Sequence, residues 1–293
     1  MTDAPKSSPA RAGAGPVPSR RLLDAARAAG RAIAALNFYN AETLVAHVRA
    51  ANDCRASIIL QTTESTIDYL GLGMAVAMAR AAADAAEMPV ALHLDHGGSY
   101  ELAARCIDAG YTSVMIDGST LPFDENCALT RRVVELARPA GVSVEGELGH
   151  VAHNDDGPSD PEAMLTRPED AARFVAATGV DALAVAVGTA HGFYRGTVRI
   201  DFDRLRRIGE AVPETALVLH GGSGVPDELL REAVRNGIRK INFGTELKNA
   251  FTGAVKASLA GTDEIDLRKT FAPAVAAVRA LSASKIRICG AES

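Results

Sequence analysis

The chain has 293 residues, of which 47% are apolar, and a formal net charge of −5. This length suits one large α/β domain or two smaller ones with a substantial core, and the negative charge argues against nucleic acid as the main partner. No apolar run approaches the roughly 20 residues of a membrane span, and four scattered cysteines without a Cys-x-x-Cys pair argue against thiolate zinc clusters and a disulfide framework. We therefore expect a cytoplasmic protein with reduced thiols and no membrane or nucleic-acid partner.

The first segment of the chain, residues 1–19, is rich in Ala, Pro, Gly and Ser. It has no apolar stretch of the kind that makes a secretory signal. This composition is typical of a disordered tail, so we expect the folded domain to span residues 20–293.

Beyond the tail, short β-branched or apolar runs alternate with longer Ala-rich segments of helical period. Eight runs are predicted to be strands, at residues 33–37, 57–61, 90–94, 113–117, 142–147, 182–187, 217–220 and 240–243. Helices are predicted at residues 41–51, 100–109, 171–178 and 229–236, with capping residues such as Asn40 and Ser99 at their starts and a closing glycine after each of the last three. Eight βα units in about 250 residues favour a single (β/α)8 TIM barrel of the α/β class over a doubly wound sheet. No G-x-G-x-x-G motif follows the first strand, which weakens the dinucleotide-binding alternative.

Polar side chains gather at the C-terminal ends of the predicted strands. They are Asn37, Thr63, Asp95, His96, Asp117, Glu145, Glu147, His191, His220 and Asn242. Catalytic groups of TIM barrels lie at this face, so the pattern predicts an active site there rather than ordinary strand ends.

The third predicted strand ends in His93-Leu94-Asp95-His96-Gly97-Gly98. Side chains alternate along a strand, so Asp95 should point opposite to Leu94 and His96. We expect the two glycines to let the backbone turn His96 back toward the site. The pair would then place a proton-transfer group beside a metal ligand or a base, whereas His93 is expected to belong to the core or to support the site.

Three histidines lie in glycine-bounded turns after strands: His96, His191 and His220. Neutral imidazoles are common ligands of zinc, and three protein ligands with one open position make a catalytic zinc site. The residue types alone leave cobalt, manganese and iron open.

Two glycine-containing loops follow the seventh and eighth strands, Gly221-Gly222-Ser223-Gly224 and Asn242-Phe243-Gly244-Thr245. Phosphate sites of TIM barrels commonly lie there, where backbone N–H groups and helix N-termini favour negative charge. A phosphorylated ligand is therefore expected, and Arg195 could add a cation to the same pocket.

With these motifs in place, the chain resembles the class II, metal-dependent ketose-bisphosphate aldolases, which include fructose- and tagatose-1,6-bisphosphate aldolases. The matching segments, in family order between residues 22 and 290, are His93-Leu94-Asp95-His96-Gly97, Met115-Ile116-Asp117-Gly118-Ser119, Val144-Glu145-Gly146-Glu147-Leu148-Gly149, Gly188-Thr189-Ala190-His191-Gly192, Leu219-His220-Gly221-Gly222-Ser223-Gly224-Val225-Pro226 and Lys240-Ile241-Asn242.

The resemblance implies that His96, His191 and His220 hold a catalytic zinc ion. It implies that Asp95 is the general acid/base at the hydroxyl whose C–C bond breaks, and that Asp117 and Glu147 orient the site or hold a second metal. Residues expected to bind substrate hydroxyls and the phosphate of dihydroxyacetone phosphate are Asn37, Thr63, Gly192, Arg195, Gly221, Ser223, Asn242 and Thr245. Arg268 matches an arginine that reaches the other phosphate, often across a dimer interface, and a monovalent cation (Na⁺ or K⁺) near the phosphate loop is a further family feature.

Three positions depart from the family pattern. Asp155 stands where members usually carry a glutamate, eight residues after Glu147, that moves the proton at the enediolate carbon, so it is a second catalytic candidate. Arg195 replaces a usual lysine. Gly244 replaces the aspartate of fructose-type members and precedes Glu246-Leu247-Lys248, as in tagatose-type members.

The expected reaction is cleavage or formation of a ketose 1,6-bisphosphate, giving dihydroxyacetone phosphate and an aldehyde such as glyceraldehyde 3-phosphate. A metal ion acting as Lewis acid needs no lysine Schiff base, which suits a chain in which no active-site lysine stands out. The alternatives are an aldolase for another phosphorylated ketose, a metal-dependent TIM-barrel hydrolase, and a non-catalytic partner-subunit paralogue. We expect a homodimer or homotetramer that acts in carbohydrate metabolism such as glycolysis.

Overall fold

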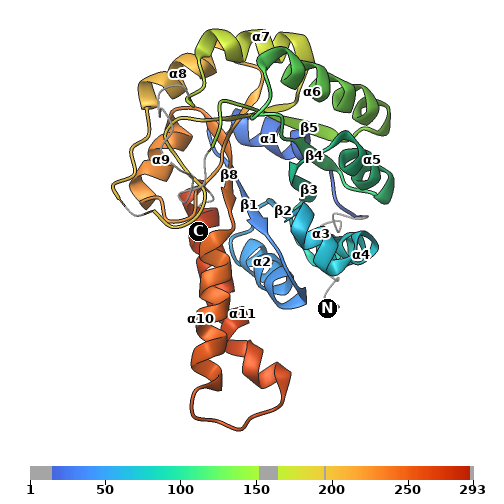
Figure 1. Cartoon of the computed structure of the whole chain (residues 1–293). Helices are drawn as coiled ribbons and strands as arrows, with labels where there is room; N and C mark the ends of the chain where they lie inside the picture. Colours follow the sequence, from blue (N-terminus) through green and yellow to red (C-terminus); the bar gives the residue numbers. More distant parts are fainter. Residues whose placement is uncertain (1–14, 152–163, 195, 291–293) are drawn as a thin grey trace, which may run out of the picture.

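The fold is a closed barrel of eight parallel strands in the order β1 to β8, with helices around it (Figure 1). The computed structural model describes residues 15–151, 164–194 and 196–290. The strands are β1 (Ile33–Asn37), β2 (Ile58–Thr63), β3 (Val90–Gly97), β4 (Ser113–Ile116), β5 (Ser143–Leu148), β6 (Ala182–Val185), β7 (Ala216–Leu219) and β8 (Ile238–Phe243). The helices are α1 (Ser19–Ala28), α2 (Ala41–Asp53), α3 (Glu64–Leu70), α4 (Leu72–Ala85), α5 (Tyr100–Ala109), α6 (Phe123–Ala137), the 3₁₀ turn η1 (Arg138–Ala140), α7 (Pro168–Thr178), α8 (Phe202–Ala211), α9 (Asp227–Arg235), α10 (Thr245–Leu259) and α11 (Leu267–Ile288).

The predicted TIM barrel is confirmed, and each of the eight predicted strands is present. The predicted helix starts also hold: Asn40 Oδ1 accepts a hydrogen bond from the Thr43 N–H at 2.9 Å, and Ser99 Oγ accepts one from the Leu102 N–H at 3.1 Å. The largest difference in a strand boundary is at β3, which continues to Gly97 instead of ending at Leu94.

Helix α1 closes the N-terminal end of the barrel. It begins at Ser19, inside the segment expected to be a tail, and the Val17 N–H already donates to the Val90 carbonyl at 2.8 Å. Residues 1–14 lie outside the described ranges. Leu22 and Leu23 of α1 pack against small and branched side chains inside the barrel: Ala35, Ile59, Ala91, Ala182, Ala184, Ala216 and Val218. The N-terminal end of the barrel is therefore filled by apolar side chains, and the active-site groups of such a barrel lie at its C-terminal end.

The last two helices, α10 and α11, pack against each other and project away from the barrel (Figure 1). Helix α11 also packs along α2. Within the described ranges, no helix is long and apolar enough to span a membrane.

Candidate active site

A cavity of about 560 Å³ opens at the C-terminal ends of the strands. Most of the residues predicted from the sequence line it together: Asn37, Thr63, Asp95, His96, Asp117, His191, Gly192, Gly221, Ser223, Asn242 and Thr245. Two further predicted residues, Glu147 and His220, are buried beside the histidines of this cavity. Closure of the barrel therefore brings polar side chains from distant parts of the sequence to one cavity at the C-terminal ends of the strands.

The end of β3 brings two consecutive side chains, Asp95 and His96, to the same cavity. The expected turn is made by His96 itself and not by the glycines, because His96 adopts the left-handed backbone (φ 50°) and the pairing of β3 with β4 shifts register between Leu94 and Gly97. Gly97 has a packing role: a Cβ there would lie 2.5 Å from the carbonyl oxygen of Met115. The left-handed residue breaks the strand alternation, which otherwise would send Asp95 and His96 to opposite faces.

Three histidines from β3, the loop after β6 and the loop after β7 converge. The ring centroids of His96 lie 4.9 Å from His191 and 4.6 Å from His220, and the potential ligand nitrogens of the three lie within 4.8 Å of one another. This is the set predicted to hold zinc.

Two carboxylates determine which nitrogen of His96 and of His220 carries the hydrogen. Asp117 Oδ2 lies 2.8 Å from His96 Nδ1, and Glu145 Oε1 lies 2.9 Å from His220 Nε2. A carboxylate only accepts, so each of these nitrogens carries the hydrogen and the lone pairs of neutral rings lie on the other nitrogens. Those nitrogens, His96 Nε2 and His220 Nδ1, face each other at 2.9 Å. Two lone pairs at this distance repel unless a cation lies against them, so the donor set fits a metal ion.

Without a metal ion, a proton can take that place on His96. Burial lowers the pKa of His96, but the hydrogen bond with Asp117 and the neighbouring carboxylates outweigh it and raise the pKa to about 9. Burial and the charge of His96 lower the pKa of His220 well below its usual range, so that ring is neutral. A metal ion must therefore compete with one proton, on His96.

Glu147 lies against the same histidines. Its Oε2 is 3.6 Å from His220 Nδ1 and 4.0 Å from His96 Nδ1, and it has no hydrogen-bond partner in the described part of the chain. Burial raises the pKa of Glu147 to about 8. His96, Asp117 and Glu147 form a second group with the spacing of metal ligands.

Asp95 is held by three side-chain amides. Its Oδ2 accepts from Asn37 Nδ2 (2.9 Å) and Gln61 Nε2 (3.2 Å), and its Oδ1 accepts from Asn242 Nδ2 (3.0 Å). Burial raises the pKa of Asp95, but His96, other nearby basic groups and the Asn37 hydrogen bond outweigh it and lower the pKa. Asp95 is thus a fixed carboxylate at the cavity, able to accept a proton.

The two predicted phosphate loops meet at the start of α10. Ser223 Oγ accepts hydrogen bonds from the backbone N–H groups of Gly244 (3.1 Å) and Glu246 (3.3 Å). A Cβ on Gly222 would lie 2.6 Å from Ile241 Cγ2, so only glycine lets the loop after β7 pack this closely on β8. The N-terminus of α10 therefore faces the cavity at Thr245, where its dipole favours an anion.

Several cavity residues were not found by sequence reasoning. Tyr39, His150 and Lys248 line the cavity, and Lys248 Nζ lies 5.6 Å from the centre of the Tyr39 ring. Tyr39 and His150 belong to no motif that would have indicated them, whereas Lys248 lies in the Glu-Leu-Lys segment already noted.

The cavity lining contains Lys248, although no active-site lysine was expected, and a second lysine, Lys240, is buried below the cavity. Lys240 has no exposed surface, and its Nζ donates to Glu145 Oε2 at 2.7 Å beneath the histidines. An ammonium paired in this way is not a free amine for a Schiff base.

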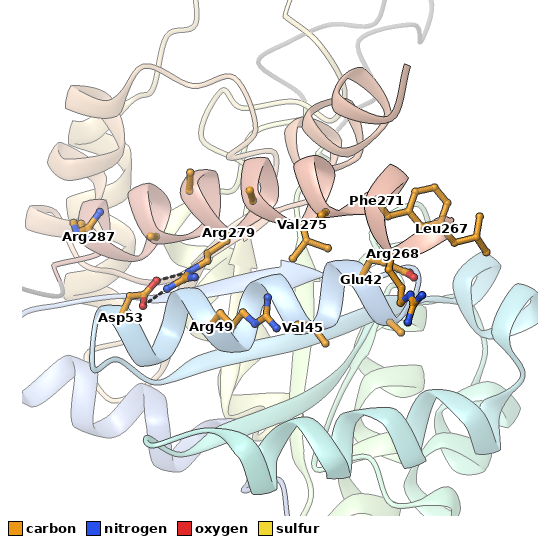
Figure 2. A pocket seen from close by; sticks show the side chains of 15 residues that line it. Glu42, Val45, Arg49, Asp53, Leu267, Arg268, Phe271, Val275, Arg279 and Arg287 are labelled. Atoms are coloured by element: carbon orange, nitrogen blue, oxygen red, sulfur yellow. Dashed lines mark hydrogen bonds and ion pairs between the residues drawn. The ribbon is translucent and has the colours of Figure 1, made fainter. Parts of the chain in front are cut away.

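Three predicted site residues are not placed at the cavity. Arg268 lines a separate groove of about 730 Å³ between α2 and α11, the larger of the two hollows. Figure 2 shows Arg268 at one end of this groove and the Asp53–Arg279 pair toward the other. The chemistry lies in the smaller cavity, because the groove contains no comparable cluster of histidines and carboxylates among its lining residues. Asp155 and Arg195 lie outside the described residues.

Comparison with known proteins identifies the family and agrees with the barrel fold. A family model described as fructose-bisphosphate aldolase class-II matches residues 17–293. The chain is similar to the YdjI aldolase from Escherichia coli K12, with 32% identity over 94% of this chain and 98% of that one and a TM-score of 0.85. It also shares its fold with a fructose-bisphosphate aldolase (Fba) from Campylobacter jejuni, with 24% identity over 94% of both chains and a TM-score of 0.72.

Proposed function

The chain belongs to the class II fructose-bisphosphate aldolase family and is an aldolase, and from that premise we propose that it cleaves a ketose 1,6-bisphosphate in a zinc-dependent retro-aldol reaction. The products would be dihydroxyacetone phosphate and an aldehyde such as glyceraldehyde 3-phosphate. The observation that carries the proposal is the fixed carboxylate of Asp95 in the same cavity as the three-histidine cluster and the two phosphate loops.

His96, His191 and His220 would hold the zinc ion. When bound, it supplies a Lewis acid that stabilises negative charge on the oxygens of the departing enediolate. Asp117 orients His96 and Glu145 orients His220, so the ring nitrogens that would hold the metal face the cluster before any metal arrives. Glu147 and Asp117 are the proposed ligands of a second metal where one binds.

Asp95 would move the proton. As the C3–C4 bond breaks, its carboxylate accepts the proton of the C4 hydroxyl, and in condensation it returns that proton to the aldehyde oxygen. The Asn37, Gln61 and Asn242 amides hold both carboxylate oxygens and prevent rotation away from the substrate. Asp155 remains the proposed residue for the proton at the enediolate carbon.

The phosphate of dihydroxyacetone phosphate would bind at the N-terminus of α10, between the loops after β7 and β8. Gly221, Ser223 and Thr245 lie around this point, and Gly192 faces it from the loop after β6. Arg195 is proposed as an additional cation, and a sodium or potassium ion as a further occupant near the phosphate. Asn37 and Thr63, on neighbouring strands, are proposed to bind hydroxyls of the sugar.

The space at Gly244 bears on the choice of sugar. A Cβ at this position would lie 3.0 Å from Asn37 Oδ1 and 3.3 Å from the Tyr39 hydroxyl. The cavity is therefore built around a glycine where fructose-type members carry an aspartate. We propose a tagatose-type preference over strict fructose specificity, with other phosphorylated ketoses as the alternatives that the assay below tests.

A second copy of the chain is the proposed partner. Leu259, Ile265 and Leu267, at the tip of the α10–α11 hairpin, are 49%, 90% and 65% exposed. Exposed apolar side chains that gather at one place are typical of an interaction surface. The groove between α2 and α11 offers Arg49 and Arg287, and the tip of such a copy also carries the acidic residues Asp263 and Glu264. A dimer formed through these surfaces would also cover Arg268, whose side chain is 91% exposed, and carry it toward the second site.

Sedimentation of the wild type and of Ile265→Asp tests the dimer. We expect the variant to become monomeric, while Tyr69→Ser, which changes another exposed side chain on α3, stays dimeric. A monomeric wild type would contradict the proposal. The proposed location is the cytoplasm, where the four cysteines, all free in the structure, would stay reduced.

The proposed reaction is tested by coupled detection of dihydroxyacetone phosphate released from a panel of ketose phosphates. We expect release from tagatose 1,6-bisphosphate or fructose 1,6-bisphosphate in the zinc-loaded enzyme. No release from any phosphorylated ketose would overturn the proposal, and hydrolysis to inorganic phosphate would favour a hydrolase instead.

A further inference from the structure

A chain of buried polar side chains runs through the barrel beneath the histidine cluster. Lys240 on β8, Glu145 on β5 and His93 on β3 are each no more than 2% exposed. Burying an ammonium and a carboxylate is unfavourable unless they pair and their other hydrogen bonds are made. Here Lys240 Nζ donates to Glu145 Oε2 (2.7 Å) and lies 3.1 Å from His93 Nε2. These contacts determine where the hydrogens lie.

The lower end of the chain is anchored at α1. An ammonium can only donate, so His93 Nε2 accepts from Lys240. Burial and the Lys240 charge lower the pKa of His93 well below its usual range, so the ring is neutral and its Nδ1 carries the hydrogen. That nitrogen donates to Ser113 Oγ at 2.7 Å, and Ser113 Oγ in turn lies 2.8 Å from Ser19 Oγ of α1.

The upper end of the chain reaches the metal site. Glu145 uses Oε2 for Lys240 and Oε1, at 2.9 Å, for the Nε2–H of His220. With its hydrogen on Nε2, His220 presents the lone pair of Nδ1 to the cluster, 2.9 Å from His96 Nε2. The opposite tautomer would present an N–H there and could not bind a metal ion.

We propose that Lys240 is a positioning residue for the metal site: by fixing Glu145, it decides which ring nitrogen of His220 faces the metal. The proposal rests on the metal site of the proposed function but not on the identity of the substrate. Without the ammonium, Glu145 Oε2 has no ion pair in the barrel interior, and the carboxylate loses the contact that directs its other oxygen to His220.

Strand β8 would then help to orient both the metal site and the proton-transfer group Asp95. Lys240 and Asn242 are two residues apart, so their side chains share the face of β8 that points into the barrel. Lys240 acts on the metal ligand His220 through Glu145, and Asn242 donates directly to Asp95 at 3.0 Å.

The first test is the zinc affinity of metal-stripped protein, measured by competition with a chromogenic chelator. Lys240→Met removes the donor and keeps much of the volume. We expect zinc to bind about 10-fold more weakly, the lower end of the loss found when a direct partner of a metal-bound histidine is removed, because Lys240 acts through Glu145. Lys285→Met is the matched control, since Lys285 is also buried (6% exposed) but pairs with Asp227 and Glu246, which belong to neither group of candidate metal ligands. It should lower stability and leave zinc affinity unchanged.

A compensating variant separates orientation from general damage. In Glu145→Gln, Lys240 should take the amide oxygen and turn the amide NH₂ toward His220 Nε2, which forces the wrong tautomer and weakens zinc binding. In the double variant with Lys240→Met, the glutamine is free to turn its oxygen back to His220 and its NH₂ toward His93, whose Nε2 lies 3.7 Å from the present Oε2. We expect the double variant to bind zinc more tightly than either single variant.

Heteronuclear NMR of the histidine ring nitrogens gives the second readout. We expect the Nε2–H tautomer of His220 in the wild type and the double variant, and the other tautomer in Glu145→Gln. The proposal would be overturned if Lys240→Met bound zinc as tightly as the wild type does, or if the double variant bound zinc no more tightly than the single variants. If Lys240→Met does not fold, Glu145→Gln against the double variant decides it. A wild type that binds zinc but cleaves no ketose phosphate would refute the proposed function and leave this test intact.

Discussion

Replacing Asp95 by asparagine should abolish cleavage while leaving the site assembled. Within the residues that the structure describes, Asn242 Nδ2 donates the one hydrogen bond to Asp95 Oδ1, whereas Oδ2 accepts from both Asn37 and Gln61. The NH₂ group of the new asparagine would therefore take the Oδ1 position, where it disturbs one hydrogen bond and not two. Asn242 can turn its amide to accept, because its Oδ1 has no hydrogen-bond partner in the part of the chain that the structure describes.

The expected loss is thus chemical. An amide cannot accept the hydroxyl proton, and general acid–base groups contribute about 10²- to 10⁴-fold, or about 3–5 kcal/mol of transition-state stabilisation. We expect kcat for cleavage to fall by that factor with a thermal midpoint within a few degrees of the wild type. Exchange of the enediolate-carbon hydrogen of dihydroxyacetone phosphate with deuterated water should persist, because Asp95 acts at the C4 hydroxyl.

The assay pairs coupled release of dihydroxyacetone phosphate with NMR of deuterium exchange in the same Asp95→Asn preparation. Cleavage within tenfold of the wild-type rate would refute the assigned role. Loss of both cleavage and exchange, with zinc still bound, would place Asp95 at the enediolate carbon instead.

Two further predictions concern the metal and the sugar pocket. The pKa of His96 is raised to about 9, so zinc affinity should rise with pH up to about 9 and then level off. Calorimetry in buffers of different ionisation enthalpy should show about one proton released per zinc near neutral pH. Affinity that does not change with pH between about 6 and 9, where His96 is still protonated, would contradict this. Gly244→Asp should lower the free energy of unfolding by about 1–3 kcal/mol, because the new side chain crowds Asn37 and Tyr39. Urea denaturation measures this loss, and the aspartate variant should also raise KM more than Gly244→Ala does. An aspartate variant more stable than the wild type would show that the pocket has room for the fructose-type residue.

The barrel and most of its active site follow from local sequence. Alternating strand and helix patterns gave the eight units, and polar residues at strand ends identified the mouth, because both signals are carried by a few adjacent residues. The turn at His96 was expected in outcome but assigned to the wrong residues. Its left-handed backbone depends on how β3 pairs with β4 near Gly97, which no local pattern specifies.

The site features that the sequence did not predict depend on contacts between residues far apart in the chain. Lys240 and Glu145 are 95 residues apart, and only closure of the barrel shows that they pair beneath His220. Tyr39 carries no motif, and it is the folded cavity and the space around Gly244 that reveal it. Arg268 was expected at a substrate phosphate, but in one chain it lies in the α2–α11 groove, so its predicted role depends on a second copy.

Metal reconstitution tests the central claim most directly. The protein is stripped with a chelator, dialysed and titrated with zinc while release of dihydroxyacetone phosphate from a ketose 1,6-bisphosphate is followed. We expect no activity in the stripped protein and a linear recovery that stops at one zinc per chain, and no recovery in His220→Ala. Full activity in exhaustively stripped protein, or undiminished recovery in His220→Ala, would contradict the account.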